Sequence, residues 1–345
     1  MHDRDRIVQL AFGSMAAQTL RAAVRLRIFE LLGDERRDAA AIAAAAGTAP
    51  QPTARLLRAL AALGLLREEP PGTFSATTTG ARLSPTHPDS LTSFVRVFTD
   101  SAVIRAWEHL DAAVRTGDIA FDAVFGTDFF SHLARDPELS ADFNAAMSQA
   151  SQATAAALPH AYDFGAFTSV TDVGGGDGTL LAAVLTAHPR LTGAVLDTPD
   201  GLARTPETLE RHGLTERCEP APGDFFRSVP KGADLFLIKS VLHDWSDEKA
   251  ATILRHCREV LPADGRVLIV EPVLPDAVAP DSGSGSGSGP GPYLSDLNML
   301  VNLGGRERTR ADFEDLCRAA GLSVTSVTEL AEAAPFSLIE AVAAR

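Results

Sequence analysis

The sequence predicts an α/β fold, in which a doubly wound parallel sheet follows a smaller, mostly helical domain. Three observations predict this class. Apolar strands and helices alternate beyond Val170, as in parallel sheets covered on both faces. A glycine-rich turn, residues 174–178, ends the first of these strands and leads into a helix. Before residue 90, helical segments are followed by two short strands, which is a winged-helix-like pattern.

Length and charge narrow the class of protein. A chain of 345 residues favours about two domains. The net charge of −14 argues against general nucleic-acid binding, because Lys and Arg supply most phosphate contacts. Three widely spaced cysteines suggest neither a disulfide framework nor a zinc site. The N-terminus is charged, and no apolar run approaches the roughly 20 residues of a membrane span, so we expect a cytoplasmic protein that does not bind membranes. We also expect no bound metal.

Residues 1–90 are expected to form the winged-helix-like domain. A DNA-binding domain of this type would present a basic recognition helix, but here that helix would carry only Arg55 and Arg58 in an acidic protein. A dimerisation scaffold is therefore the favoured interpretation. The expected elements are one long or two short helices over 7–32, helices over 38–46 and 52–63, and strands over 65–68 and 73–76.

Residues 91–160 are expected to be a helical connector rich in large apolar side chains. These side chains favour core packing, and they could equally line a cavity against the next domain. They are Trp107, Phe121, Phe125, Phe129, Phe130, Phe143 and Met147.

Residues 161–345 are expected to hold the parallel sheet. Ser246 and Thr309 are candidate helix N-caps. Residues 281–292, largely Gly and Ser, predict a flexible surface loop. The expected strands are 170–173, 192–196, 233–239, 266–271, 323–330 and 336–343, and the helices after the glycine turn are 206–212, 247–261, 293–303 and 309–320.

The glycine turn predicts nucleoside binding. Its Gly174-x-Gly176-x-Gly178 spacing is one residue tighter than the dinucleotide fingerprint and does not match a phosphate-binding P-loop. Asp197 ends the next strand, about twenty residues on, where an acid can accept hydrogen bonds from ribose hydroxyls. Ligands of such sheets bind at the carboxyl ends of the strands, where Gly174, Asp197, Asp224, Lys239 and Glu271 are all expected.

Four motifs in order resemble a known family: the class I S-adenosylmethionine-dependent O-methyltransferases of the plant caffeate and flavonoid type, with their bacterial polyketide and antibiotic-tailoring relatives. The likeness covers nearly the whole chain. It implies a Rossmann-like methyltransferase domain and a homodimer that exchanges N-terminal helices. The motifs are Asp172-Val173-Gly174-Gly175-Gly176-Asp177-Gly178, Gly223-Asp224-Phe225-Phe226, Leu242-His243-Asp244-Trp245-Ser246-Asp247-Glu248 and Gly304-Gly305-Arg306-Glu307-Arg308-Thr309.

The resemblance implies S-adenosylmethionine as the cofactor, S-adenosylhomocysteine as its product, and no metal. The implied cofactor contacts are Gly174 and Gly176 beside the methionine moiety, Asp197 at the ribose, Asp224, Phe225 and Trp245 at the adenine, Lys239 close to the cofactor, and Ser151 at its carboxylate.

The resemblance further implies that His243 is the general base and that Glu271 and Glu307 flank it. The acceptor would be a phenolic or other hydroxylated aromatic small molecule of secondary metabolism, as in antibiotic biosynthesis. The connector, 91–160, would contribute to the acceptor pocket. The positions implied to line that pocket are Met147, Asn302, Met299 and Phe129.

The residue types suit this chemistry. A phenol with a pKa near 10 is mostly neutral at pH 7, so an imidazole that takes its proton can contribute about 10²–10⁴-fold. His243 suits this role because the unperturbed pKa of an imidazole is near neutrality, and carboxylates beside the ring would fix its tautomer. Asp244 and Asp247 are expected to be helix-start charges only, and Arg306 and Arg308 to be solvated or structural ion-pair residues.

Three alternatives stay open at this stage. A related enzyme could keep the cofactor and catalyse hydroxylation, decarboxylation or rearrangement; the acceptor could be an amine; or the chain could be a winged-helix transcription regulator that senses a nucleoside. Asp197-Thr198-Pro199-Asp200 also departs from the Leu-Pro-His usual in plant members, so acceptor specificity does not carry over from them. The acceptor, the position methylated and the pathway are not set by these motifs.

Overall fold

The chain divides into two compact units. The structure, a computed structural model, describes residues 3–69, 72–278 and 289–344. One unit comprises Met1–Ile104 with Glu138–Ala150, and the other Arg105–Pro137 with Ser151–Arg345. The domain boundaries expected above, 1–90, 91–160 and 161–345, stay a prediction.

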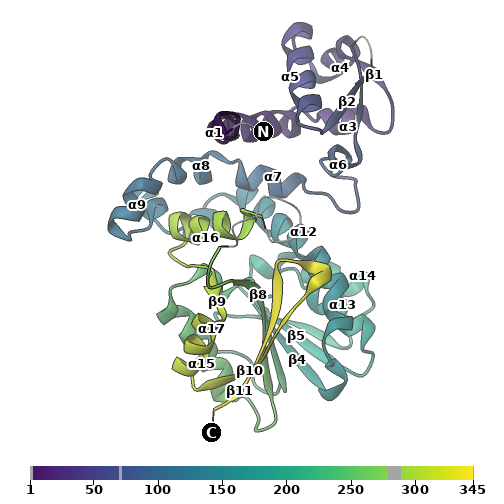
Figure 1. The fold of residues 1–345 in the computed structure, drawn as a ribbon. Coiled ribbons are helices and arrows are strands. Elements are labelled where there is room, and N and C mark those ends of the chain that lie inside the picture. Colours follow the sequence, from purple (N-terminus) through teal and green to yellow (C-terminus); the bar gives the residue numbers. More distant parts are fainter. Residues whose placement is uncertain (1–2, 70–71, 279–288, 345) are drawn as a thin grey trace. The chain divides into compact units, whose positions relative to one another are not determined.

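The first unit packs helices on a small antiparallel sheet whose strand order is β1-β3-β2 (Figure 1). Phe29, Leu57, Leu60 and Phe74 are among its buried core residues. The strands are β1 (Arg37–Asp38), β2 (Leu66–Glu69) and β3 (Thr73–Ala76), and the helices are α1 (Asp3–Ala11), α2 (Gly13–Arg25), α3 (Ile28–Leu32), α4 (Ala39–Ala46), α5 (Pro50–Ala62), α6 (Thr78–Ala81) and α7 (Thr92–Phe98).

The expected N-terminal elements are confirmed with one correction. Residues 7–32 fall in three helices, since Arg27 adopts a left-handed φ of +57° immediately before α3 and interrupts the helical path. Asp38 caps α4 by accepting a hydrogen bond from the Ala41 N–H, and Gly47 ends that helix in the left-handed conformation.

The helices between the N-terminal elements and the large sheet are mostly short, with one long exception. Gly117 and Gly126 end two of them in the left-handed conformation. They are α8 (Ser101–Trp107), α9 (Leu110–Thr116), α10 (Ala120–Phe125), α11 (Phe129–Leu133) and the long α12 (Pro137–Ala161). Within the described residues, no helix has the length and apolar character needed to cross a membrane.

The second unit contains the large sheet, in the order β10-β11-β8-β7-β4-β5-β6, with β9 beside β8. The strands from β6 to β8 run parallel, whereas β11 and β10 are antiparallel. The strands are β4 (Ser169–Val173), β5 (Thr192–Asp197), β6 (Cys218–Pro222), β7 (Leu235–Lys239), β8 (Arg266–Leu274), β9 (Arg308–Thr309), β10 (Leu322–Glu329) and β11 (Phe336–Ala343).

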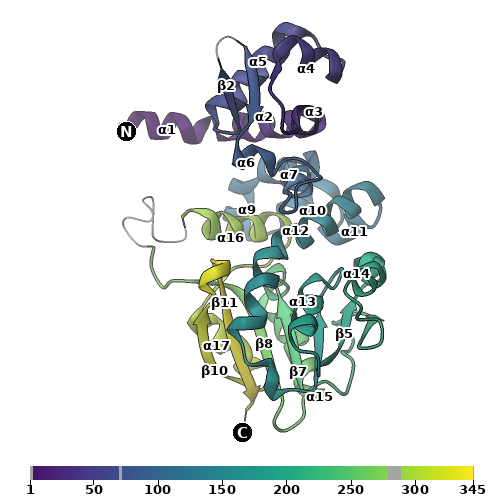
Figure 2. The ribbon, with the colours of Figure 1, turned by 90° about the vertical axis from the view of Figure 1, so that its right-hand side faces the viewer.

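Helices cover both faces of this sheet (Figure 2). The covering helices are α13 (Thr179–Ala187), α14 (Thr205–Arg211), α15 (Asp247–Val260) and α17 (Arg310–Ala319), whereas α16 (Gly291–Asn302) lies against α9 and α10. The 3₁₀ turns are η1 (Phe164–Ala166), η2 (Gly201–Arg204), η3 (Leu242–Asp244) and η4 (Ala331–Ala333). Alternate residues of one strand point to opposite cores: Leu237 packs with α13 and α14, and Ile238 with α15 and α17. This doubly wound arrangement confirms the expected fold class.

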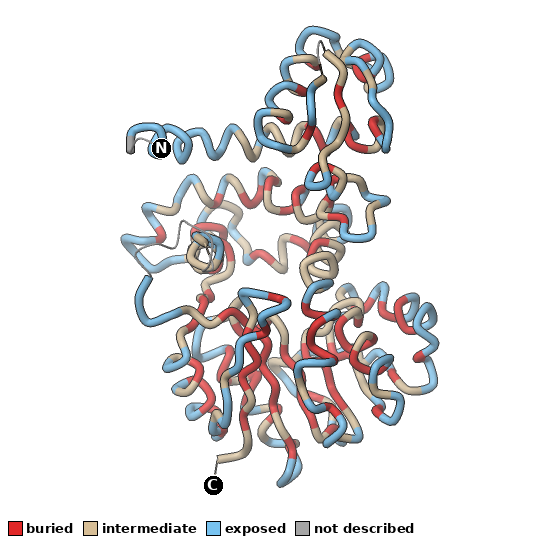
Figure 3. The backbone as a smooth tube through the Cα atoms, turned by 45° about the vertical axis from the view of Figure 1, so that its right-hand side comes forward, coloured by how far each residue is buried: buried red, intermediate tan, exposed pale blue. Residues whose placement is uncertain are grey.

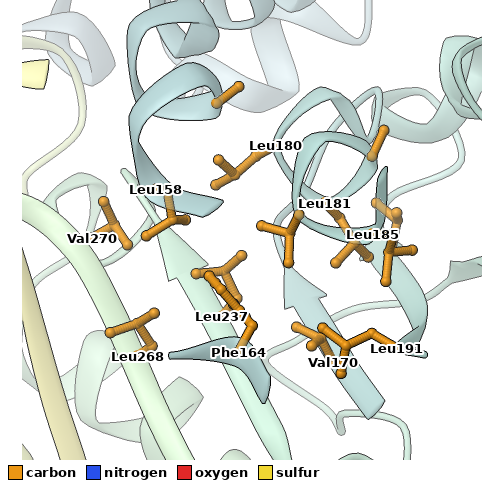
Figure 4. Close-up of a cluster of buried hydrophobic side chains, with 14 of the residues drawn as sticks. Leu158, Phe164, Val170, Leu180, Leu181, Leu185, Leu191, Leu237, Leu268 and Val270 are labelled. Carbon is orange, nitrogen blue, oxygen red and sulfur yellow. The ribbon is translucent and has the colours of Figure 1, made fainter. Parts of the chain in front are cut away.

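Each face of the sheet has its own apolar core. In the first, Leu181 and Leu185 from α13 meet Val170 and Leu237 from the strands (Figure 4). Burial is concentrated in the strands and in the helix sides that cover them (Figure 3). A rigid sheet therefore fixes the loops at its carboxyl edge, where the candidate site residues lie.

Three of the described strands, β1, β6 and β9, were not expected from the sequence. Residues 218–222 form β6, although they include Pro220 and Pro222, which lack an N–H group. Among the described residues, β6 is an edge strand that pairs with β5 alone, and prolines are tolerated at such an edge. Most of the Gly-Ser stretch, 281–292, lies outside the described residues, so the expected loop has no structural account here.

Candidate active site

The glycine turn follows β4 directly and has a backbone that glycine suits. Gly174, Gly176 and Gly178 have φ values of +74°, +56° and +77°. A Cβ on Gly174 would lie 2.6 Å from the Val241 side chain, whereas a Cβ on Gly176 would meet nothing within 4 Å. Gly174 is therefore needed for close packing, and Gly176 has open space beside it where another molecule could approach.

Two aspartates stand beside this turn, Asp172 buried and Asp197 partly buried. Asp197 accepts a hydrogen bond from the Gly176 N–H at 2.9 Å and another from the Thr198 N–H at 2.7 Å. Asp172 was not singled out from the sequence, although it immediately precedes the first glycines. Its burial, together with the charge of Asp197, raises its pKa to about 7. The turn is thus bordered by carboxylates that can still accept hydrogen bonds.

Lys239 and Ser151, both expected near the cofactor, lie together. The Lys239 Nζ donates to the Ser151 Oγ at 3.0 Å, which joins the end of β7 to α12. Burial lowers the pKa of Lys239 to about 8, although Asp172 partly offsets this effect. The Lys239 ammonium in turn partly offsets the effect of burial on the pKa of Asp172.

An aromatic cluster borders the loop after β6. Trp245 stacks on Phe130 at 5.3 Å and meets Phe226 edge-on at 4.8 Å and Phe225 at 6.3 Å. The Trp245 Nε1 is buried with no hydrogen-bond partner among the described residues. Asp224 is exposed, and its carboxylate accepts from the Phe226 N–H at 2.9 Å.

These features fit a nucleoside ligand. They combine the open space at Gly176, a carboxylate on the turn in Asp197, aromatic rings at Phe225 and Trp245, and a buried N–H donor without a protein partner. No group of three His, Cys, Asp or Glu side chains that could hold a metal ion occurs in the ranges that the structure describes.

His243 lies in the short turn η3, between β7 and α15. Its Nδ1 is 3.0 Å from the Glu307 Oε1. Glu307 is itself fixed, because its Oε1 accepts from the Ser295 Oγ at 2.8 Å and its N–H donates to Asp296 at 2.8 Å. The His243 Nε2 lies 3.5 Å from the Asp244 Oδ1, beyond ordinary hydrogen-bond length.

Glu271 lies against the backbone of the His243 turn and makes no hydrogen bond to the ring among those the structure shows. Its Oε1 accepts backbone N–H groups from Val241 at 3.1 Å, Leu242 at 2.7 Å and His243 at 3.3 Å. It therefore holds the backbone of the turn, whereas Glu307 alone of the two glutamates bonds the ring. Sequence order could not reveal this difference, because it depends on the register between β7 and β8.

The charges around His243 move its pKa away from the near-neutral value of a free imidazole. Burial by itself would lower the pKa of the imidazole, but Asp244, Glu307 and Glu271 outweigh burial and raise it to about 10. Burial also raises the pKa of Asp244 to about 7. Asp244 is thus part of the ring's electrostatic environment and not only a helix-start charge.

The arginines of the last motif are structural ion-pair residues, as expected. Arg308 is fully buried and contacts Asp247 at 2.8 Å. Arg306 is partly exposed and bonds Asp247 at 3.0 Å and Asp312 at 2.9 Å. Asp247 therefore neutralises two arginines in addition to starting α15, a role that its position alone did not predict.

The positions expected to line the acceptor pocket are mostly buried. Asn302, Met299 and Phe129 are 3%, 6% and 5% exposed. The Asn302 Nδ2 donates to the Asn298 Oδ1 at 2.8 Å, and that oxygen also accepts from the Trp107 Nε1 at 3.0 Å. The Asn302 Oδ1 is left buried with no partner in the described part of the chain.

Met147, the remaining position expected at the acceptor pocket, lies on α12 in the first compact unit. Its role there stays a prediction, as do the other assigned site roles.

Comparison with known proteins places these features in context. Residues 107–323 match a family model described as an O-methyltransferase domain, and residues 8–86 match an O-methyltransferase dimerisation domain. The chain is 48% identical to O-demethylpuromycin-O-methyltransferase of Streptomyces alboniger, over 98% of this chain and 89% of that protein. It is 36% identical to phenazine O-methyltransferase PhzM of Lysobacter antibioticus, over 97% and 95% of the two chains.

The solved structures agree with this relationship. The crystal structure of LaPhzM superposes with a TM-score of 0.91 at 34% identity, covering 99% of this chain and 100% of that one. NcsB1, an O-methyltransferase from neocarzinostatin biosynthesis, superposes with a TM-score of 0.79 at 34% identity over 96% and 98% of the chains, and it was solved with S-adenosylmethionine and 2-hydroxy-5-methyl naphthoic acid.

Proposed function

The chain belongs to the S-adenosylmethionine-dependent O-methyltransferase family, and from this premise we propose that it methylates a hydroxyl group of an aromatic small molecule, with His243 as the general base. The observation that carries the base assignment is the hydrogen bonding of the ring. Glu307 engages Nδ1 at 3.0 Å, which leaves Nε2 as the nitrogen that can meet an acceptor oxygen.

The cofactor would be held by residues at the carboxyl edge of the sheet. When bound, S-adenosylmethionine supplies an electrophilic methyl group carried on a sulfonium. Gly174 and Gly176 would border its methionine moiety, Asp197 its ribose and Phe225 its adenine. The space beside Gly176 and the remaining acceptor capacity of Asp197 support this assignment. Lys239 and Ser151, already hydrogen-bonded to each other, would lie at the cofactor's carboxylate.

The raised pKa of His243 defines how the proton moves. An imidazole with a pKa of about 10 is a cation at pH 7, so an acceptor hydroxyl would bind as its anion beside an imidazolium. To act as the base, the ring first loses its own proton to solvent and then takes the proton of a neutral phenol, so binding releases one proton overall. The imidazolium at Nε2 stabilises the phenolate, and the Glu307 carboxylate stabilises the imidazolium.

An unpartnered amide oxygen supports the proposed acceptor pocket. Asn302 is almost fully buried, and its NH₂ group is committed to Asn298, so its Oδ1 can only accept. Since a buried polar atom normally has a partner, an acceptor carrying a second O–H or N–H donor would satisfy it. Hydroxylated aromatic acids and phenols that bear a neighbouring polar group fit this requirement.

Two relatives define the alternatives that an experiment must separate. Aclacinomycin 10-hydroxylase RdmB of Streptomyces purpurascens is 32% identical, and an 8-amino-8-demethylriboflavin N,N-dimethyltransferase of Streptomyces davaonensis is 35% identical. Incubation with S-adenosylmethionine and matched phenol and aniline forms of one aromatic compound, followed by mass spectrometry, separates the three activities. A product heavier by one methyl from the phenol supports the proposal, and a product heavier by one oxygen or a methylated amine alone contradicts it.

We further propose that the chain is a cytoplasmic homodimer without nucleic-acid function. Exposed apolar side chains support a protein partner at the N-terminal helices, where Leu10 is 74% exposed and Ile7 68%. Leu10 falls within residues 8–86, which match the dimerisation domain, and Ile7 immediately precedes that region. Light scattering of the purified chain measures the assembly, and a monomer at micromolar concentration contradicts it.

A further inference from the structure

The turn that carries His243 is held from two sides by buried charges of opposite sign. On one side, the Glu271 carboxylate accepts the N–H groups of Val241, Leu242 and His243. On the other side, the Arg308 guanidinium donates to the carbonyl oxygens of Leu242 at 2.8 Å and Trp245 at 3.0 Å. The backbone N–H groups of the turn thus donate to the Glu271 carboxylate, and its carbonyl oxygens accept from the Arg308 guanidinium.

Arg308 can be buried against the turn because a neighbouring carboxylate neutralises its charge. Its side chain has no exposed surface, and a buried cation without a partner would be strongly destabilising. Asp247, the first residue of α15, accepts from the Arg308 Nε at 3.0 Å and from a terminal nitrogen at 2.8 Å. The planar guanidinium therefore links the turn to the start of the following helix.

The segment that carries Arg308, residues 305–308, also approaches the backbone of the turn closely. A Cβ on Gly305 would lie 2.0 Å from the His243 carbonyl oxygen and 2.4 Å from the Asp244 carbonyl carbon. Gly305 thus packs on the backbone of the turn, Glu307 bonds the His243 ring, and Arg308 bonds the flanking carbonyls. One short stretch of chain fixes the backbone of the base and the orientation of its ring together.

We propose that Arg308 is a positioning residue, which sets the place of the His243 turn relative to Glu307 so that the imidazole meets the acceptor in a productive geometry. This inference rests on the proposed role of His243 as the base. Its physical ground is the sensitivity of group transfer to alignment, because a misplacement of about 1 Å can cost about 10²-fold in rate.

Arg308→Lys tests the proposal, with Arg306→Lys as the matched control. Both arginines bond Asp247, but only Arg308 bonds the carbonyls of the turn. A single ammonium cannot reproduce the fork that spans Leu242, Trp245 and Asp247. We expect Arg308→Lys to lower kcat by about 10- to 100-fold. The calorimetric Kd for S-adenosylmethionine should stay within about threefold of wild type, because the change leaves the nucleoside contacts in place. Arg306→Lys should match wild type.

Hydrogen–deuterium exchange supplies a readout that does not depend on turnover. The amides of residues 241–243 should exchange faster in Arg308→Lys than in Arg306→Lys, because the turn loses its anchor on the carbonyl side. Equal exchange and equal kcat in the two variants overturn the proposal. If His243→Ala retains full turnover, the base assignment fails, and the exchange data still decide whether Arg308 holds the turn.

Asp247→Asn provides a second variant in case Arg308→Lys does not fold. Asp247 is 55% exposed, so the fold should tolerate this change, which removes the counter-charge that holds Arg308 against the carbonyls of the turn. Faster exchange at residues 241–243 than in Arg306→Lys supports the proposal, and exchange equal to that control contradicts it.

Discussion

The Glu307 carboxylate and the His243 imidazole form the central contact of the candidate site, with Oε1 and Nδ1 separated by 3.0 Å. The same oxygen accepts from the Ser295 hydroxyl, so the carboxylate is fixed from α16. Fixing Nδ1 in this way determines which ring nitrogen is left for chemistry, and several measurable consequences follow from it.

Replacing His243 by Ala should reduce kcat by about 10²–10⁴-fold, because the group that accepts the acceptor proton is lost. The calorimetric Kd for S-adenosylmethionine should stay close to wild type, since the proposed nucleoside contacts are on other residues. His109→Ala, an exposed histidine at the start of α9, is the control. Turnover in His243→Ala equal to that of the control rules out the base assignment.

The pH dependence of kcat/KM should expose the raised pKa of His243. The imidazole is protonated below about pH 10, so kcat/KM should rise as the pH increases from 7 toward that value. Glu307→Gln keeps the size of the side chain but removes a charge that favours the imidazolium. Its acid limb should move to lower pH, alongside a lower maximum rate. A wild-type profile that is flat above pH 7 would falsify this view of the site.

Acceptor binding should release a proton. Calorimetry of acceptor binding in two buffers with different ionisation enthalpies measures the number of protons exchanged. With an imidazolium already present, a phenol binding as its anion gives a release approaching one proton per site at pH 7.5. The same titration with Glu307→Gln should release less, because more of the imidazole is then neutral beforehand. No release in the wild type contradicts the protonation state assigned to His243.

The open space at Gly176 predicts a selective loss of cofactor affinity in Gly176→Ala. The left-handed backbone costs an alanine about 1 kcal/mol, but no protein atom opposes the added Cβ. A bound nucleoside would be displaced, so the Kd for S-adenosylmethionine should rise about tenfold, equivalent to roughly 1.4 kcal/mol. Gly117→Ala, with φ +78° and equally open surroundings at the end of α9, is the matched control. Equal effects of the two changes on Kd refute a nucleoside at Gly176.

The apolar surface of the N-terminal helices predicts a dimer that a charge disrupts. Leu10→Glu, together with Met15→Glu, places two carboxylates on side chains that are 74% and 62% exposed. We expect monomers by light scattering with helical content retained, since neither side chain is buried in the isolated chain. Val114→Glu, 65% exposed and outside the dimerisation region, should leave the assembly unchanged. A dimer that survives the double change places the interface elsewhere.

Local sequence signals predicted much of the fold. Thr309 caps α17 through a reciprocal capping box with Asp312, as its position before a helical pattern indicated. The glycine turn, the buried strand that ends at Lys239 and the helix capped by Ser246 were likewise predictable, because each depends on residues only a few positions apart.

Long-range pairings explain what the sequence did not predict. Glu271 reaches the turn of His243 from 28 to 30 residues away, and Arg308 reaches it from 63 to 66. The raised pKa of His243 results from its sequence neighbour Asp244 and from Glu307 and Glu271, which only the fold brings close to it. Motifs therefore identified which residues matter, whereas strand register and loop packing decided what each one contacts.

The proline-containing strand β6 also limits how molecules of this protein can associate. Two of its five residues cannot donate a backbone hydrogen bond, so its outer side is a poor template for a strand from another copy. The large sheet is thereby protected from end-to-end growth on that side, and a crowded solution of the folded protein has one fewer route to fibrous aggregates.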